Sequence, residues 1–346
     1  MTVYCGVDFH ARLQTVSYCD TADGEVCQRD LNHQQDDIRS FYARFTGHVI
    51  VGIEASGYSD WFEQLLEELG HEVWLGDATE IRRLAKRRQK NDQRDADHLL
   101  DLLLKGEFPR LHRHRPESLE VLRQLRYRRR LVKITTMIKN NLQAIAISGG
   151  LSVKGELFTR AGRCRLAALS LSPVLGRQRD EWLRLLDDVA GQVERSESWL
   201  KEQAAGDERV RRLRTHPGVG LLTSLALVHT LCPVDRFANT RKVTAYIGLE
   251  PTEYSSAEKQ RFGTISKAGS RLVRFLLGEA AQVAARYDDE LKTFYQRLLR
   301  RKGKAKAVTA VARKLLVRSF IMLRDEIDYA EFRRRGVEAR SARVYT

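Results

Sequence analysis

The stretch K-N-D-Q-R-D-A-D-H-L-L, residues 90–100, places three aspartates at the start of a predicted helix and directly follows the basic run at 82–90. Residues three apart in a helix lie about 60° apart around its axis, so Asp92 and Asp95 share one face, whereas Asp97 points away from Asp95. An acidic first turn also complements the helix dipole, which would explain these residues without any ligand. Carboxylates elsewhere in the chain decide between the two interpretations.

Two further carboxylates lie in apolar stretches that are predicted to be strands. Asp8 lies within G-V-D-F-H at 6–10, and Glu54 lies within V-G-I-E-A-S-G at 51–57. A buried strand rarely carries an unpaired charge without a role, although Glu54 could also be a plain loop residue at a strand end. Magnesium prefers oxygen ligands in near-octahedral geometry. The four acids Asp8, Glu54, Asp92 and Asp95 together therefore indicate a magnesium-dependent phosphodiester site.

The order of predicted elements is β-β-β-α-β-α-β-α. Strands are expected at 3–8, at 14–19, in a third short segment ending at about residue 31, at 48–53 and at 72–75. Helices are expected at 35–45, 59–69, 78–88 and from residue 90 onward. The first three strands should form an antiparallel meander. This order resembles the ribonuclease-H-like fold, as in Holliday-junction resolvases of the RuvC type, where acids on the first strand, the fourth strand and a late helix meet at one edge. The expected fold class is α/β plus α.

Charge is distributed unevenly along the chain. The 346 residues carry a net charge of +15, yet the first 105 contain 19 acidic and 12 basic residues, which leaves +22 for residues 106–346. Such a basic body favours a polyanion, and a pI of about 9.8 points to nucleic acid. No apolar run approaches the roughly 20 residues that span a bilayer, and the first residues do not show the basic-then-apolar pattern of a secretion signal. The five cysteines form no C-x-x-C pair, so reduced thiols in the cytoplasm are expected.

Two long helices are expected at 119–147 and 178–203, where apolar residues recur at helical spacing. They imply an antiparallel pair, either a coiled-coil-like spacer that also dimerises or a helical hairpin within a monomer. The glycine-containing segment 148–176 is the predicted mobile loop, and the chain after residue 331 is expected to fray. In the first long helix, Arg126, Arg129 and Arg130 surround Tyr127, which suits contact with a nucleic-acid backbone as well as simple solvation.

A turn with the sequence H-P-G-V-G, residues 216–220, resembles a helix-hairpin-helix element. Backbone N–H groups at Gly218 and Gly220 could hold a phosphate there, although a plain turn between helices is a comparable interpretation. The polar loop that follows, at 254–271, adds the basic candidates Lys259, Arg261, Lys267 and Arg271.

Seven ordered motifs carry a wider resemblance: G-V-D-F-H, G-I-E-A-S-G, K-N-D-Q-R-D-A-D, H-P-G-V-G, Y-I-G-L-E-P, S-S-x-E-K-x-R-x-G and S-K-A-G-S-R. Together they resemble the DEDD transposases of the insertion-sequence one-ten family, relatives of the Piv DNA invertase, from about residue 3 to the predicted helix at 308–323. The resemblance implies a RuvC-like domain whose acids Asp8, Glu54, Asp92 and Asp95 bind magnesium. It also implies a nucleophilic serine at Ser256, where Ala257 replaces the family's usual glycine and Ser255 is the neighbouring alternative.

The same resemblance implies a domain organisation. It gives a RuvC-like DEDD domain at 1–108, a helical spacer with a mobile insert at 109–206, a C-terminal transposase domain with the serine at 207–330, and a tail at 331–346. A noncoding bridge RNA would select donor and target DNA by base pairing. A homodimer or tetramer would assemble the synaptic complex at the nucleoid.

The implied chemistry is attack of the serine on DNA. The acids and the serine could meet within one chain or between chains, and the long helical spacer leads us to the hypothesis of a composite site across a dimer. A magnesium-dependent nuclease or junction resolvase that uses water is the first alternative. A non-catalytic RNA-binding scaffold with relic acids is the second.

Overall fold

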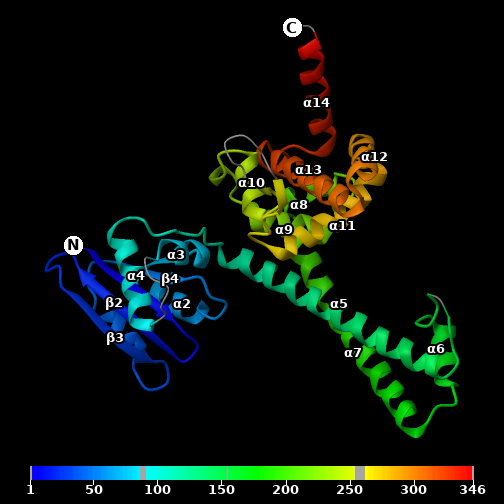
Figure 1. The fold of residues 1–346 in the computed structure, drawn as a ribbon, viewed down its shortest axis with the longest axis horizontal. Helices are drawn as coiled ribbons and strands as arrows, with labels where there is room; N and C mark the ends of the chain where they lie inside the picture. Colours follow the sequence, from blue (N-terminus) through cyan, green and yellow to red (C-terminus); the bar gives the residue numbers. More distant parts are fainter. Residues whose placement is uncertain (1, 86–90, 154, 254–261, 345–346) are drawn as a thin grey trace. The chain divides into compact units, whose positions relative to one another are not determined.

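The computed structural model describes residues 2–85, 91–153, 155–253 and 262–344. The chain forms two compact units, Met1–Arg113 and His114–Thr346. Figure 1 shows the sheet of the first unit in blue and the helices of the second from green to red. The predicted boundaries of the functional domains stay a prediction.

The first unit is built on a five-stranded sheet with the order β3-β2-β1-β4-β5. The antiparallel meander is confirmed, since β1 (Thr2–Phe9) pairs with β2 (Leu13–Asp20), which pairs with β3 (Val26–Asn32). Strands β4 (His48–Glu54) and β5 (Glu72–Gly76) extend the sheet in parallel with β1. The predicted β-β-β-α-β-α-β-α order is confirmed.

Helices cover both faces of this sheet. On one face, Cys5 and Val7 of β1 are buried beneath α1 (Ile38–Ala43) and α2 (Asp60–Glu68). Helix α1 begins later than predicted because Asp37 caps it, accepting a hydrogen bond of 2.9 Å from the Ser40 N–H. The other face packs against α3 (Ala78–Leu84) and α4 (Asp92–Leu104).

Two glycines let α4 lie directly on the sheet. Gly6 of β1 and Gly52 of β4 are register partners. A Cβ on Gly6 would lie 2.3 Å from the Leu100 nitrogen and 2.5 Å from the Ala96 oxygen, and one on Gly52 would lie 2.8 Å from the Phe108 ring. Because neither position has room for a side chain, the backbone of α4 contacts the backbone of β1.

The second unit begins with a helical hairpin of α5 (Pro116–Ser148) and α7 (Pro173–Ala204). The predicted antiparallel pair is confirmed, since Gln124 contacts Ser196 at 3.1 Å and Tyr127 contacts Gln192 at 3.1 Å. Its predicted dimerisation stays a prediction.

The prediction of a mobile loop at 148–176 is wrong for much of its length. The segment contains α6 (Arg160–Ala167), and α7 already begins at Pro173. Leu157 and Leu166 are buried in the apolar core between α5 and α7, which explains why the segment folds onto the hairpin. Helix α6 carries three arginines and only one large apolar residue, Leu166, which is a weak sequence pattern, so this helix was not predicted.

A helical bundle completes the unit. It contains α8 (Glu208–Arg214), α9 (Leu221–Leu231), α10 (Thr240–Ile247), α11 (Arg271–Tyr287), α12 (Asp289–Lys302) and α13 (Lys304–Arg324), with the short strands β6 (Pro251–Glu253) and β7 (Phe262–Ile265). Leu315, Leu316 and Phe320 of α13 are buried in its core. Among the described helices, none combines the length and apolar character that crossing a bilayer requires. All five cysteines are free, as predicted.

The prediction of a frayed end after residue 331 is also wrong. The chain forms α14 (Tyr329–Val344) there. Ion pairs one helical turn apart support it, since Arg334 contacts Glu331 at 2.7 Å and Glu338 at 2.6 Å. The apolar pattern of this segment is weak, which is why the sequence did not indicate a helix.

Candidate functional site

Two strand-borne acids lie at one edge of the sheet. Val7 of β1 pairs with Ile53 of the parallel strand β4, so Asp8 and Glu54 are the next residues on neighbouring strands. Val7 and Ile53 face the core beneath α1 and α2. Because side chains alternate along a strand, Asp8 and Glu54 lie on the opposite face, which α4 covers.

Helix α4 brings its own acids to Asp8. Asn91 caps the helix by accepting a hydrogen bond of 3.2 Å from the Gln93 N–H. The backbone contact at Gly6 fixes Ala96 over β1, and the turn before Ala96 carries Asp92 and Asp95.

Asp97 has a different role, as the helix spacing predicted. Its Oδ1 accepts hydrogen bonds from the Ser17 hydroxyl at 2.7 Å and from the Gln28 amide at 2.5 Å. These contacts tie α4 to β2 and β3. Asp101 forms an ion pair at 2.5 Å with Lys105, the residue that follows the last turn of α4. Neither aspartate joins the acids that face Asp8.

His10 is a further member of the site that was not among the predicted residues. Its Nε2 lies 3.2 Å from Asp8 Oδ2 and 3.8 Å from Asp92 Oδ1. One potential ligand atom from each of Asp8, His10 and Asp92 lies within 4.8 Å of the others. The sequence did contain a signal for His10. It lies two residues after Asp8 at the end of β1, and side chains two apart along a strand lie on the same face of the sheet.

Negative charge is crowded around Asp8. Burial raises the pKa of Asp8; the charge of His10 opposes that shift, and the charges of Asp95 and Asp92 add to it. The Asp8 side chain is only 17% exposed, whereas that of Asp92 is 56% exposed. Carboxylates that destabilise one another in this way fit a divalent cation, since a bound positive charge would relieve the repulsion.

Glu54 lies at the predicted edge of the sheet, but its carboxylate contacts an arginine. Its Oε1 is 3.2 Å from Nη2 of Arg82 on α3. The structure therefore brings Asp92 close to Asp8 and places Asp95 near enough for its charge to raise the pKa of Asp8. Glu54 instead forms an ion pair with Arg82.

The predicted nucleophile lies outside the described residues. Ser256 and its alternative Ser255 fall within 254–261, the connection between β6 and β7, together with Lys259 and Arg261. The two strands pair at Pro251 with Ile265.

The base of this hairpin is held by two glycines. Gly248 has φ of 73°, and a Cβ there would lie 2.1 Å from the Ala268 oxygen. Gly269 has φ of 67°, and a Cβ there would lie 1.9 Å from the Tyr246 oxygen. The motifs Y-I-G-L-E-P and S-K-A-G-S-R therefore pack backbone against backbone, which only glycine permits.

Two family models match most of this architecture. Residues 5–146 match a DEDD-type family described as Transposase, and residues 210–296 match the Transposase IS116/IS110/IS902 family. The chain belongs to the IS110 family of transposases. It is 27% identical to a probable family 20 transposase of Pseudomonas aeruginosa over 89% of this chain and 93% of that one. It is 29% identical to the transposase for insertion sequence element IS1111A of Coxiella burnetii over 65% of this chain and 64% of that one.

The H-P-G-V-G turn of the transposase joins α8 to α9, as predicted. Gly218 has φ of 90°, and a Cβ there would lie 2.5 Å from the Ala280 oxygen of α11. Gly218 therefore allows the turn to contact α11. The predicted phosphate-binding role of Gly218 and Gly220 stays a prediction.

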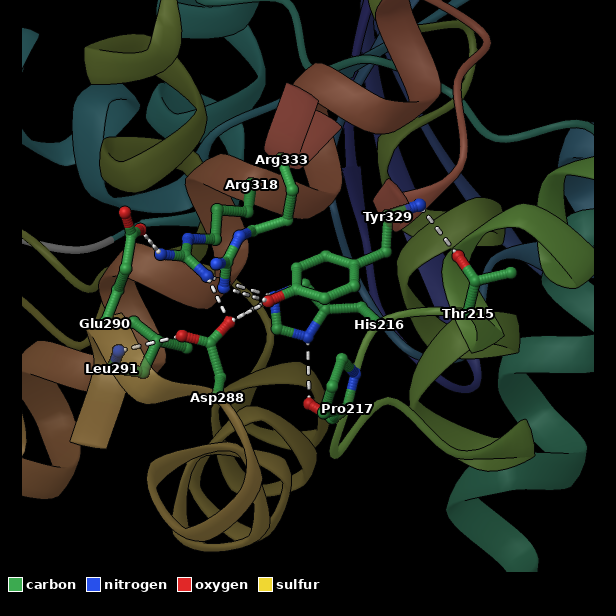
Figure 2. A network of polar contacts seen from close by, with 9 residues as sticks. All are labelled: Thr215, His216, Pro217, Asp288, Glu290, Leu291, Arg318, Tyr329 and Arg333. Carbon is green, nitrogen blue, oxygen red and sulfur yellow. Dashed lines mark hydrogen bonds and ion pairs between the residues drawn. The ribbon is translucent and has the colours of Figure 1, made fainter. Parts of the chain in front are cut away.

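His216 of this turn is buried in a polar network, which Figure 2 shows. Its Nδ1 lies 2.8 Å from the Pro217 carbonyl, so Nδ1 carries the proton and donates. Its Nε2 lies 3.5 Å from Nη1 of Arg318. Burial lowers the pKa of His216 to about 4, so the imidazole is neutral.

The same network secures α14. Arg318 donates to Asp288 at 2.6 Å and to Glu290 at 2.6 Å. The Tyr329 hydroxyl, at the start of α14, also donates to Asp288. Burial opposes ionisation of Asp288, but these partners outweigh it and hold the pKa of Asp288 below its usual range. Four segments of the bundle therefore meet at one buried carboxylate.

Within the described part of the chain, the predicted nucleic-acid-binding residues fall into two groups. Arg129, Gly218, Gly220, Lys267 and Arg271 line two adjoining pockets of the second unit, although they span more than 140 positions of the chain. Arg126 and Arg130 are exposed on α5 and line neither pocket.

Proposed function

We propose that this transposase cuts and joins strands of donor and target DNA through a magnesium-dependent site made by Asp8, Glu54, Asp92 and Asp95, with Ser256 as the covalent nucleophile. The observation that carries the proposal is the approach of Asp92 to Asp8 at the edge of the five-stranded sheet, with His10 within 4 Å of both. The strand order β3-β2-β1-β4-β5, with helices on both faces, supports a ribonuclease-H-like domain.

The acids of this site are suited to a divalent cation. Asp8, Asp92 and Asp95 would hold it from two elements, and Glu54 would join after leaving Arg82. That exchange is easy, because the Arg82 and Glu54 side chains are 68% and 35% exposed and such surface pairs contribute about 0–1 kcal/mol. Bound magnesium would polarise a phosphoryl group and neutralise its charge in the transition state. Asp97 keeps α4 in place through Ser17 and Gln28.

The proposed covalent step is an in-line displacement at a DNA phosphate. The Ser256 Oγ–P bond forms while the bond from phosphorus to the 3′-oxygen breaks. The serine gives up its hydroxyl proton and the departing 3′-oxygen takes one up, so the DNA ends as a 5′-phosphoserine and a free 3′-hydroxyl. That hydroxyl can later attack the phosphoserine of another end, which exchanges strands without an external energy source.

The partners follow from charge and from the family. The basic body, at +22 for residues 106–346, suits a polyanion, and we propose a bridge RNA that pairs with donor and target DNA in the cytoplasm at the nucleoid. A homodimer or tetramer would let Ser256 of one chain act with the acids of another.

Trapping the adduct tests the covalent step. A DNA substrate labelled on the 5′-phosphate side of the cut should remain attached to the protein after denaturation, and Ser256→Ala should abolish the adduct while Ser255→Ala retains it. Cleavage without an adduct would support the water-dependent nuclease or resolvase instead. Cleavage that is insensitive to Asp92→Asn would support the scaffold.

Two further experiments address the partners. Mixing Ser256→Ala with Asp8→Ala protein should restore activity if the site is shared between chains. Sequencing the RNA that co-purifies from the native host should reveal a species whose loops match donor and target DNA. Recombination by protein that carries no RNA would contradict the guided part of the proposal.

A further inference from the structure

A basic pocket lies at the base of the β6–β7 hairpin. It has a volume of about 480 Å³ and is lined by the cationic side chains of Arg129, Lys267, Arg271 and Arg274, with no carboxylate among its described lining residues. Arg129 comes from α5, Lys267 from the turn after β7, and the other two from α11. We refer to it as the four-cation pocket.

The charge of the four-cation pocket is not balanced by any acidic side chain in the part of the chain that the structure describes. No described carboxylate forms an ion pair with any of its four cations. Arg129 instead donates to the Arg271 carbonyl at 3.4 Å, and its guanidinium lies 3.9 Å from the centre of the Phe275 ring. Arg274 donates to the carbonyls of Ile247 at 2.8 Å and of Gly269 at 3.2 Å.

The cations also oppose one another's charge. Burial lowers the pKa of Arg129 and of Arg274, and in both cases the charge of Arg271 lowers it further. Other arginines of this unit have acidic partners: Arg128, the next residue on α5, forms an ion pair with Glu197 at 2.6 Å. Because like charges without counter-ions destabilise one another, the four-cation pocket is suited to an anion that comes from outside the chain.

The backbone at Lys267 is strained where it enters the pocket. Lys267 has φ of 59°, and Glu326 is the other non-glycine residue with a positive φ in the described part of the chain. A left-handed conformation disfavours an L-residue by about 1–2 kcal/mol, and such strain concentrates at functional sites. The backbone contacts of Gly248 and Gly269 on either side keep Lys267 in this conformation.

The position of the pocket indicates which anion it takes. Leu249, just before β6, and Ile265, at the end of β7, both line it. These strands lead into and out of 254–261, the segment that carries Ser256. An anion in the four-cation pocket would therefore be bound beside the base of the hairpin that presents the proposed nucleophile.

The neighbouring surface suits a nucleotide rather than a free ion. Phe275 is 43% exposed and lines both this pocket and the adjoining one of about 660 Å³, where Val132, Val283 and Gly220 also lie. A phosphate beside Arg129 would place its base within reach of the Phe275 ring, and aromatic stacking accepts any base. Arginine forks match phosphate oxygens in pairs.

We propose that the four-cation pocket binds a backbone phosphate of the DNA strand that Ser256 attacks, a few nucleotides from the scissile bond. This inference rests on the proposed function, because it takes Ser256, in the connection between β6 and β7, as the nucleophile. The pocket anchors the strand while the hairpin presents the hydroxyl, and it recognises the backbone rather than the base sequence.

The test measures binding without cleavage. Full-length protein is titrated with fluorescent single-stranded DNA from the end of its own element, in EDTA, across a range of salt concentrations. Arg129→Ala/Arg271→Ala should weaken binding by about tenfold or more and reduce the slope of log affinity against log salt by about one to two. The matched control is Arg163→Ala/Arg165→Ala, which removes the same charge from α6, where the two arginines contact Asp187 and Glu156.

A second arm locates the phosphate. Single methylphosphonates, which carry no charge, are placed at each position of the DNA in turn. At one position within a few nucleotides of the cut, neutralisation should weaken binding by the wild-type protein and have no further effect on Arg129→Ala/Arg271→Ala. Arg129→Lys/Arg271→Lys should retain most of the binding, which separates loss of charge from misfolding.

Three outcomes would overturn the inference. The first is an equal loss of DNA affinity in the pocket variant and in the α6 control variant. The second is the absence of any methylphosphonate position that weakens binding by the wild-type protein alone. The third is a pocket variant that binds RNA more weakly and DNA as tightly as the wild-type protein does. Failure of the serine mechanism gives a different result, because it removes the covalent adduct and leaves these binding measurements unaffected.

Discussion

Gly6 of β1 lies so close to Ala96 of α4 that a Cβ on the glycine would be 2.5 Å from the alanine carbonyl oxygen. Gly6→Ala must therefore push α4 away from the sheet and carry Asp92 and Asp95 away from Asp8. We expect a loss of about 1–3 kcal/mol in the free energy of unfolding, measured by chemical denaturation, together with loss of DNA cleavage. Gly57→Ala is the control, because a Cβ at Gly57 would meet nothing within 4 Å. Equal behaviour of the two variants would contradict the close approach.

Asp8 is the acid whose ionisation the fold opposes most clearly. Because its pKa is raised in the folded protein, the ionised form destabilises the metal-free fold above that pKa, and stability should rise as the group is protonated. Asp8→Asn should therefore raise the melting temperature in EDTA at neutral pH. It should also abolish the increase in melting temperature that magnesium gives the wild-type protein. Asp101→Asn, on the far end of α4, should keep that increase. A magnesium response that survives in Asp8→Asn would exclude Asp8 as a ligand.

Arg82 forms an ion pair with Glu54, so in the proposed site it would compete with magnesium for that carboxylate. Removing it in Arg82→Ala should free Glu54 and increase the affinity for magnesium, as measured by calorimetry. The loss of a surface ion pair should change the free energy of unfolding by less than about 1 kcal/mol. Arg83→Ala provides the comparison, since Arg83 lies on the same helix and contacts Glu80 at 2.6 Å. Unchanged affinity in Arg82→Ala would argue that Glu54 does not bind the metal.

His216 makes the bundle sensitive to acid. Its pKa is about 4 in the folded protein against an ordinary value of 6.5, so the unfolded chain binds the proton more tightly. Stability is therefore complete above about pH 6.5 and falls as the pH drops toward 4. From about pH 7.5 to about pH 5, we expect His216 to account for about 2 kcal/mol of lost stability. His216→Asn retains a donor for the Pro217 carbonyl and cannot titrate, so its denaturation midpoint should vary less with pH. Parallel pH profiles of the two proteins would contradict this role.

The first unit could be predicted closely from the sequence because its signals are local. Alternating or continuous apolar runs marked the five strands, and the three-residue spacing separated Asp92 and Asp95 from Asp97. His10 was missed because its approach to Asp92 depends on how α4 docks against β1. The Arg82–Glu54 ion pair was missed for a similar reason, since nothing in the local sequence indicates which carboxylate a helix arginine selects.

The second unit was harder to predict because its features combine distant segments. The two long helices were expected from their periodicity, but α6 and α14 have weak apolar patterns and are held by Leu157, Leu166 and Tyr329. Each basic residue of the four-cation pocket looked like an ordinary surface charge in the sequence. The contacts of Arg129 of α5 with Arg271 and Phe275 of α11 show that Arg129 and Arg271 share one pocket, which no carboxylate lines in the described part of the chain.

The paired glycines Gly248 and Gly269 make two separate motifs of the chain depend on each other. The base of the hairpin rests on main-chain contacts between Y-I-G-L-E-P and S-K-A-G-S-R, because each glycine packs against the backbone of the other motif. Change at either glycine would disturb the bundle itself. A residue other than glycine at position 248 or 269 would therefore need a compensating change in the other motif, 21 positions away along the chain.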